Sequence, residues 1–128
     1  QYTFFGFPCV YYGDEVGMEG YKDPFCRGCY PWGKENKLLL DFYRRLGEIR
    51  SLPVFSDGDF SELAAENGVY AFRRNDAASG TEAVVAVNRG SVDYELTLPD
   101  TYRDLLTGRE YKDRCILSPM GYVILRRI

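Results

Sequence analysis

The spacing of apolar and polar residues changes once along the chain, near residue 52. Before that point, residues 35–50 carry apolar residues at helical spacing on one side and charged residues on the other. The apolar positions are Leu39, Phe42 or Tyr43, Leu46 and Ile49. This spacing predicts an amphipathic helix of about four turns. Such a stripe is more typical of a core-facing surface than of a binding face, so we assign it no ligand.

After Leu52 the pattern becomes that of short strands. Pro53 ends the helical spacing, and β-rich runs follow between turn signals. Asn67-Gly68 and Arg89-Gly90 each separate two such runs, and each predicts a two-residue hairpin. The runs cover residues 60–64, 69–73, 82–88, 92–98, 102–106, 109–112, 115–117 and 121–126. Roughly six to eight strands without intervening helices predict an antiparallel sandwich.

The chain opens with a different pattern. Phe7 to Tyr12 is a short apolar run, rich in aromatic and β-branched residues, that stops at Gly13. It predicts a buried strand of a parallel sheet. Charged residues then lie among glycines and Pro24, and they include Asp14, Glu15, Glu19, Asp23 and Arg27. Charged groups just past the C-terminal end of a strand are typical of ligand sites in α/β barrels, so we expect this loop to carry function.

The order of residues between Gly6 and Trp32 is specific. The pattern reads Gly6-x-Pro8, then Tyr11-Tyr12-Gly13-Asp14-Glu15-x-Gly17-Met18, then Asp23-Pro24-x-x-Arg27 and Trp32. It resembles the eighth strand and following loop of the α-amylase family of glycoside hydrolases, and most closely the neopullulanase, cyclomaltodextrinase and maltogenic amylase group. The chain departs from the family at Tyr30, where many relatives carry Met, and in its short loop after Trp32. These two departures bear on which substrate is preferred more than on membership of the family.

The second half resembles the same family. Residues 104–108, Asp-Leu-Leu-Thr-Gly, and the closing run of residues 117–125 are similar to parts of the C-terminal β domain that follows the barrel. Such domains are usually Greek-key sandwiches. The resemblance therefore implies a mainly β chain with two parts, which meet between Arg50 and Val54. Residues 1–50 would be the remnant eighth β/α unit of a (β/α)8 barrel, and residues 51–128 an antiparallel Greek-key β-sandwich.

The resemblance also implies that the catalytic groups lie elsewhere. Family members cleave α-glucosidic bonds with an aspartate nucleophile, a glutamate acid/base and a second aspartate, all of which would precede Gln1. We therefore expect a fragment with no catalytic residue and no activity of its own. Asp14 and Glu15 are a poor substitute for the two carboxyls about 5 Å apart that a retaining mechanism needs, because neighbours in an extended chain point to opposite sides. A complete barrel also needs at least about 200 residues, more than the 128 present.

Substrate contacts are implied for the D-P-x-x-R motif. In the family, its Asp and Arg reach the sugar on the non-reducing side of the cleavage point, which implies substrate binding by Asp23 and Arg27. A carboxylate accepts hydrogen bonds from two vicinal hydroxyls, and a guanidinium donates in a fixed fork. The alternative is that the two side chains pair with each other and brace the loop. We expect Asp14 and Glu15 to accept backbone N–H bonds from the following loop. Trp32 has two open roles, a platform that stacks on a sugar or, as we expect, an anchor of the loop against the helix.

Composition limits other functions. A net charge of −3 does not indicate the positive surface that binds nucleic acid or an anionic membrane. The apolar segment over residues 2–12 is too short to span a bilayer. Cys26-x-x-Cys29 invites a metal site, but the chain has no His and its other cysteines, Cys9 and Cys115, are distant. Free thiols are therefore favoured, and we expect no cofactor and no metal. If oxidised, the four cysteines allow three pairings. So few cysteines suit a reducing cytosol.

Three functions stay open. The first is the C-terminal part of an α-glucan hydrolase acting on maltooligosaccharides, cyclodextrins, starch or pullulan, in which the β domain stabilises the barrel. The second is a carbohydrate-binding module, although Tyr70, Phe72, Tyr94 and Tyr122 follow the alternation typical of core positions. The third is an assembly role. A strand without neighbours exposes unpaired backbone groups, so residues 1 to 30 would be disordered, rearranged or paired with a second copy in a homodimer.

Overall fold

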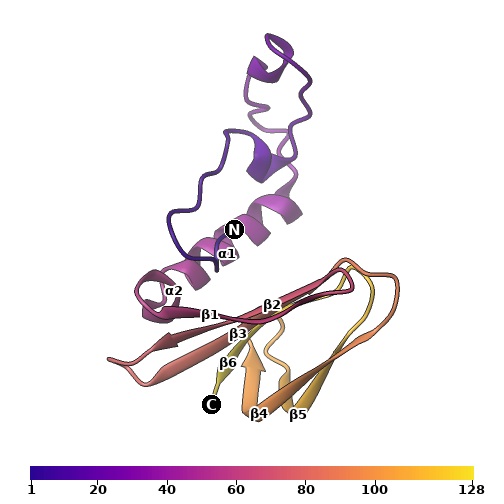
Figure 1. The fold of residues 1–128 in the computed structure, drawn as a ribbon. Helices are drawn as coiled ribbons and strands as arrows, with labels where there is room; N and C mark the ends of the chain where they lie inside the picture. Colours follow the sequence, from indigo (N-terminus) through magenta and orange to yellow (C-terminus); the bar gives the residue numbers. More distant parts are fainter. The chain divides into compact units, whose positions relative to one another are not determined.

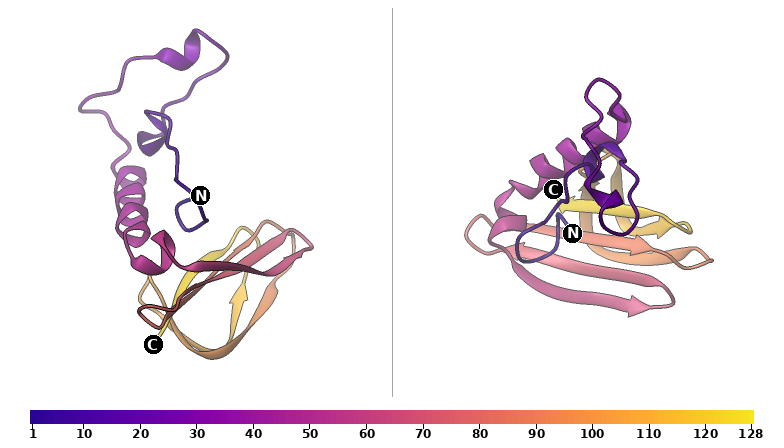
Figure 2. Two further views of the ribbon diagram at one scale, coloured as in Figure 1. Left: turned by 60° about the vertical axis from the view of Figure 1, so that its left-hand side comes forward. Right: turned by 90° about the horizontal axis from the view of Figure 1, so that it is seen from above.

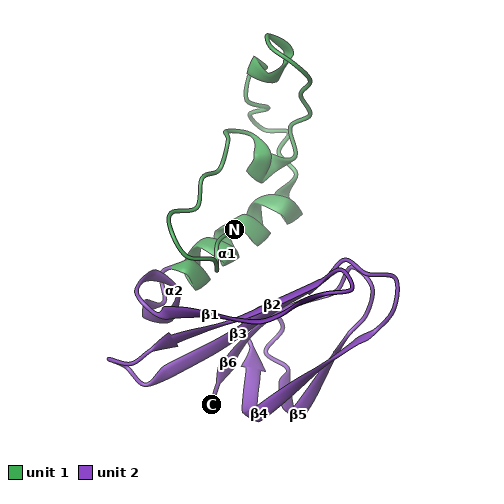
Figure 3. Ribbon diagram, in the orientation of Figure 1, with its two compact units in different colours: residues 1–50 green, residues 51–128 purple.

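The computed structural model describes residues 1–128, which form two compact units (Figure 3). The first unit is Gln1–Arg50 and the second is Ser51–Ile128. The first contains two short 3-10 turns, η1 (Asp14–Val16) and η2 (Phe25–Arg27), and the helix α1 (Lys37–Arg50). The second contains the short helix α2 (Pro53–Ser56) and all six strands (Figure 1).

The helix predicted over residues 35–50 is confirmed as α1. It begins at Lys37 because Asn36 caps it: the Asn36 side-chain oxygen accepts the Leu39 N–H at 3.1 Å, and its carbonyl accepts the Leu40 N–H at 3.0 Å. The predicted apolar stripe is half-buried along its length, and Ile49 is fully buried. The stripe is therefore a packing surface.

The strand predicted over residues 7–12 is wrong. These residues form no strand, and the Phe7 side chain is fully exposed. A parallel strand is stable when neighbouring strands pair with its backbone groups, and residues 1–50 contain no strand. The interpretation of this unit as a barrel remnant stays a prediction. So does the homodimer through residues 1 to 30.

The second unit is a six-stranded antiparallel sheet with the order β1-β2-β3-β6-β4-β5. Its strands are β1 (Asp59–Glu66), β2 (Val69–Asp76), β3 (Thr81–Asn88), β4 (Tyr94–Asp104), β5 (Glu110–Leu117) and β6 (Tyr122–Arg127). Figures 1 and 2 show β4 and β5 folded across β1 to β3, so that one sheet bends into two layers. The predicted mainly antiparallel β architecture is confirmed.

The core lies between these layers. It draws alternate residues from β2, β3, β4, β5 and β6, as expected where one face of each strand is buried. Its members are Ala71, Val84, Ala86, Leu96, Leu98, Tyr102, Cys115, Leu117, Val123 and Leu125. Among the four aromatic residues expected in the core, Phe72 is buried, and Tyr70 and Tyr94 are half-buried. The expectation is wrong for Tyr122, which is 53% exposed because it starts β6 opposite the exposed Val87.

One of the two predicted hairpins forms. Asn67 and Gly68 join β1 to β2 with φ angles of 50° and 80°, the two positive values of a type I′ turn. The hairpin predicted at Arg89-Gly90 is wrong, because β3 pairs with β2 and β6 and has no edge left for β4. Instead, the Arg89 N–H donates to the Gly68 carbonyl at 2.8 Å. A Cβ on Gly90 would lie 2.5 Å from the Asn67 carbonyl oxygen, so this contact requires glycine.

Asn88 holds the crossing from β3 to β4 in place. Its side chain is 1% exposed, and its amide nitrogen donates to the carbonyls of Val92 at 2.9 Å and Leu117 at 2.8 Å. Its amide oxygen accepts the Gly90 N–H at 2.8 Å. Three backbone groups of two connections thus depend on one buried amide.

Asp76 caps the turn between β2 and β3. Its carboxylate accepts hydrogen bonds from the Ser79 hydroxyl and the Ala78 N–H. The Ser79 bond is the main cause that lowers the pKa of Asp76 below its usual 3.8. A carboxyl with a lowered folded-state pKa contributes stability above its unfolded pKa and loses it as pH falls through its folded pKa.

We therefore expect Asp76→Asn to have a lower free energy of unfolding than the parent at pH 7. The difference in free energy of unfolding should narrow as pH falls below 3.8. Urea denaturation at a series of pH values measures it. The exposed Asp93→Asn serves as the control for the loss of one negative charge. A difference between Asp76→Asn and the parent that stays constant from neutral pH to pH 3 would contradict this role.

Candidate functional site

The loop that follows residue 12 is shaped by Gly13. This glycine has a φ of 94°, and its carbonyl accepts the N–H groups of Val16 and Met18 at 3.1 and 2.9 Å. A Cβ here would lie 2.4 Å from the Met18 sulfur, so the turn requires glycine. The Gly13 N–H donates to the Glu15 carboxylate at 2.9 Å. Glu15 therefore binds a backbone N–H, but this N–H belongs to the preceding Gly13 and not to the following loop as expected.

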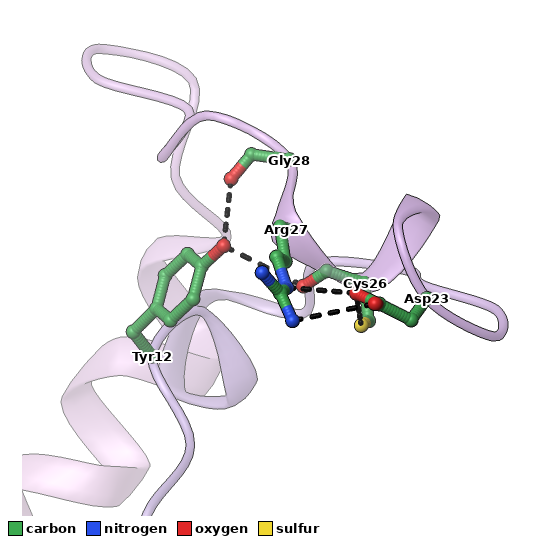
Figure 4. Close-up of polar contacts among 5 residues, drawn as sticks. All are labelled: Tyr12, Asp23, Cys26, Arg27 and Gly28. Carbon is green, nitrogen blue, oxygen red and sulfur yellow. Dashed lines mark hydrogen bonds and ion pairs between the residues drawn. The ribbon is translucent and has the colours of Figure 1, made fainter.

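Asp23 and Arg27 lie one turn apart on and beside η2 and form a two-point ion pair (Figure 4). Arg27 Nε lies 2.7 Å from Asp23 Oδ1, and Arg27 Nη2 lies 3.3 Å from Asp23 Oδ2. The Arg27 and Asp23 side chains are 70% and 62% exposed. An exposed ion pair contributes about 0 to 1 kcal/mol, so it opens at little cost when a ligand offers other partners.

Tyr12 and Cys26 tie this pair into the loop. The Tyr12 hydroxyl donates to the Gly28 carbonyl at 3.0 Å, so it joins the two ends of the loop (Figure 4). The Cys26 thiol lies 3.8 Å from Asp23 Oδ1, within the range of a weak sulfur hydrogen bond. Sequence reasoning gave Tyr12 no role of its own, although it belongs to the Tyr11-Tyr12-Gly13 pattern.

A pocket of about 220 Å³ lies in the same loop. Its lining includes three tyrosines and two carboxylates, and the full set is Tyr11, Tyr12, Asp14, Met18, Glu19, Gly20, Tyr21 and Cys26. Asp14, which we expected to bind backbone, is exposed and lines this pocket instead. Asp23 and Arg27 do not line it, but Cys26 between them does. Aromatic faces beside carboxylate acceptors can bind both the apolar faces and the hydroxyls of sugars.

Trp32 does not anchor the loop, so that expectation is wrong. Its side chain is 81% exposed and contacts the Tyr30 ring at 4.5 Å between centroids. The Lys34 N–H donates to the Pro31 carbonyl at 2.9 Å, which closes a turn with Trp32 near its tip. A side chain at the tip of an exposed turn lacks the burial that anchoring requires.

The cysteines form no disulfide in the structure. Cys9 and Cys29 are exposed, Cys26 is half-buried, and Cys115 is buried in the core, where burial raises the pKa of its thiol. No group of three or more His, Cys, Asp or Glu side chains is placed to hold a metal ion. None of the helices is both long and apolar enough to cross a membrane.

Comparison with known proteins places the chain. Residues 71–127 match the family model described as the β-galactosidase C-terminal domain. The cyclomaltodextrinase of Thermoanaerobacter pseudethanolicus is 38% identical over 98% of this chain and 23% of its own length. An Anoxybacillus α-amylase structure superposes with a TM-score of 0.88 and 30% identity, over 98% of this chain and 30% of that one. The chain matches enzymes of the α-amylase family over part of their length.

Within the α-amylase family, this chain corresponds to a C-terminal part. It spans 9% of the length of the amylopullulanase of Thermoanaerobacterium saccharolyticum, which is 37% identical over 84% of this chain. It also spans 24% of a cyclomaltodextrinase structure, which covers 100% of this chain with a TM-score of 0.84 and 31% identity. The resemblance to the α-amylase family, drawn from residues 6–32, 104–108 and 117–125, is thus confirmed.

Proposed function

We propose that this chain forms the C-terminal portion of a retaining α-glucan hydrolase that cleaves α-glucosidic bonds in maltooligosaccharides, cyclodextrins, starch or pullulan. Relatives named amylopullulanase, cyclomaltodextrinase and maltogenic α-amylase support the substrate class. The observation that carries the proposal is the exposed Asp23–Arg27 pair (Figure 4). Cys26, which lies between the two residues in the chain, lines the tyrosine-lined pocket.

In this proposal Asp23 and Arg27 bind substrate. The Asp23 carboxylate accepts from two vicinal sugar hydroxyls, and the Arg27 guanidinium donates to oxygen atoms of the same sugar. Since the pair is exposed, replacing it by these bonds costs little, and the bonds to charged groups are each stabilising by about 1.5 to 3 kcal/mol. The two residues thereby orient the sugar.

Other segments of the enzyme would supply the catalytic acids. A retaining mechanism needs two carboxyls about 5 Å apart across the scissile bond. In the loop of this chain, Glu15 is bound to the Gly13 N–H and Asp23 to Arg27. We infer that the chain alone does not cleave glucans, and that residues 51–128 stabilise the catalytic barrel in the intact enzyme.

A graft tests this function. The chain replaces the matched segment of the Thermoanaerobacter pseudethanolicus cyclomaltodextrinase, and hydrolysis of a cyclodextrin is measured for the graft, for the same enzyme without the segment, and for the chain alone. We expect activity in the graft only. Hydrolysis by the purified chain alone, or a graft that is folded by circular dichroism yet inactive, would count against the proposal.

A further inference from the structure

At one end of the sheet, core-facing positions of three neighbouring strands change from apolar to polar. On β2 the face that carries Ala71 continues with Arg73 and Asn75, and on β3 the face of Val84 begins with Glu82. The polar set consists of Asp59 and Ser61 of β1, Arg73 and Asn75 of β2, and Glu82 of β3. Polar residues at positions that alternation assigns to a core are typical of functional sites.

Strand pairing brings this set together near the β2–β3 turn (Figure 1). Asp59, Asn75 and Glu82 lie side by side in one row across the three strands, and Ser61 and Arg73 lie in the next. With Phe60 they line a pocket of about 320 Å³, which we call the β1–β3 pocket. Small-molecule sites have volumes of about 300 to 1,000 Å³, so this pocket suits a small ligand.

Buried contacts hold the floor of the pocket. The Glu82 side chain is 12% exposed and accepts a hydrogen bond from the hydroxyl of Tyr102, which is fully buried. Burial, and then Glu82, raise the pKa of Tyr102 above its usual 10.0, so the hydroxyl keeps its proton. Arg73 Nε donates to the Ser61 hydroxyl at 3.3 Å. Arg73 Nη1 lies 3.9 Å from Glu82 Oε2, which leaves that oxygen weakly paired.

The pocket carries charges of both signs, two carboxylates from Asp59 and Glu82 and one guanidinium from Arg73. An anion or a cation would therefore meet a like charge as well as an opposite one. A neutral ligand with several hydroxyls uses both kinds of group, because each hydroxyl donates to a carboxylate and accepts from a guanidinium or amide. The exposed Asp59 and Asn75 at the rim offer further partners of both kinds.

We propose that the β1–β3 pocket binds a neutral saccharide, as a glucan contact separate from the Asp23–Arg27 loop. The preference for a hydroxyl-rich neutral ligand follows from the pocket, whereas the choice of α-linked glucose rests on the proposed function. Because the pocket belongs to residues 51–128, it gives this unit a glucan contact of its own, beyond stabilising the barrel.

Titration of the isotope-labelled 128-residue chain with maltose, followed by NMR, tests the pocket. We expect saturable shifts at the backbone amides of residues 59–61, 73–75 and 82. Asp59→Ala and Asn75→Ala change exposed side chains and should each weaken binding about tenfold. Asp93→Ala, an equally exposed aspartate outside the pocket, should leave the Kd unchanged.

The same titration separates failure of this inference from failure of the proposed function. Shifts confined to residues 1–50 would overturn the pocket and leave the loop assignment standing. In the Asp23→Ala chain, the shifts at the pocket amides should persist. Their loss would overturn the inference that the β1–β3 pocket binds independently of the Asp23–Arg27 loop. The inference would be overturned if maltose caused no shift at the pocket amides, or if the Kd for maltose stayed unchanged in both pocket variants. It would also be overturned if calcium chloride or sodium phosphate shifted the pocket amides more strongly than maltose does.

Discussion

Replacing Asp23 by alanine in the grafted cyclomaltodextrinase is expected to lower kcat/KM for maltoheptaose about 100-fold. The change removes a carboxylate that accepts from two sugar hydroxyls, and bonds of this kind are each stabilising by about 1.5 to 3 kcal/mol. The free energy of unfolding should change by less than about 0.5 kcal/mol, because the pair with Arg27 is exposed. Steady-state kinetics and urea denaturation of the same preparations measure both quantities.

Asp41→Ala is the matched control for this prediction. Asp41 is an exposed aspartate of the same unit, and it also pairs with an arginine, Arg44, at 3.1 Å. It lies on α1 and outside the D-P-x-x-R motif, so its loss should leave kcat/KM unchanged. Equal losses in the two variants would mean that charge alone, and not the position of Asp23, accounts for the effect. Unchanged kinetics in Asp23→Ala would remove its assignment to substrate.

The largest effect on stability is expected at Asn88. Asn88→Ala should lower the free energy of unfolding by about 3 kcal/mol, because it leaves the carbonyls of Val92 and Leu117 and the Gly90 N–H without their partner. Asn88→Asp should be at least as damaging, since it places a carboxylate oxygen against both carbonyls.

Urea denaturation of the full chain measures this loss. Asn75→Ala is the control, because Asn75 is an exposed asparagine on the neighbouring strand β2. We expect the control to change the free energy of unfolding by less than about 0.5 kcal/mol. A loss below about 1 kcal/mol for Asn88→Ala would show that water replaces the amide, and that the crossing does not depend on it.

Local signals predicted the elements whose partners are also local. The period of Leu39, Leu46 and Ile49 predicted α1, and Asn67-Gly68 predicted the first hairpin. Arg89-Gly90 carried a similar signal but failed, because β6, more than thirty residues later, occupies the edge of β3. The run over residues 7–12 failed for a related reason, since the first unit offers it no neighbouring strand.

The candidate sites divide in the same way. Asp23 and Arg27 are four residues apart, so their motif was visible in the sequence and their pairing was one of its two expected outcomes. The β1–β3 pocket draws on three strands, and its residues share a face only through the register of those strands. Its signal was the polar interruption of alternation at Arg73 and Glu82, which acquires meaning once the pairing is known.

The position of β6 constrains the order in which the sheet can be completed during synthesis. This strand is the last of the unit to leave the ribosome, yet it pairs with both β3 and β4 in the interior of the sheet. After β1 to β3 have emerged, the edge of β3 therefore stays unpaired until nearly the whole unit has been translated. A premature stop before Tyr122 would leave two half-sheets with nothing to join them, and a nascent chain in that state is a substrate for chaperones or proteases.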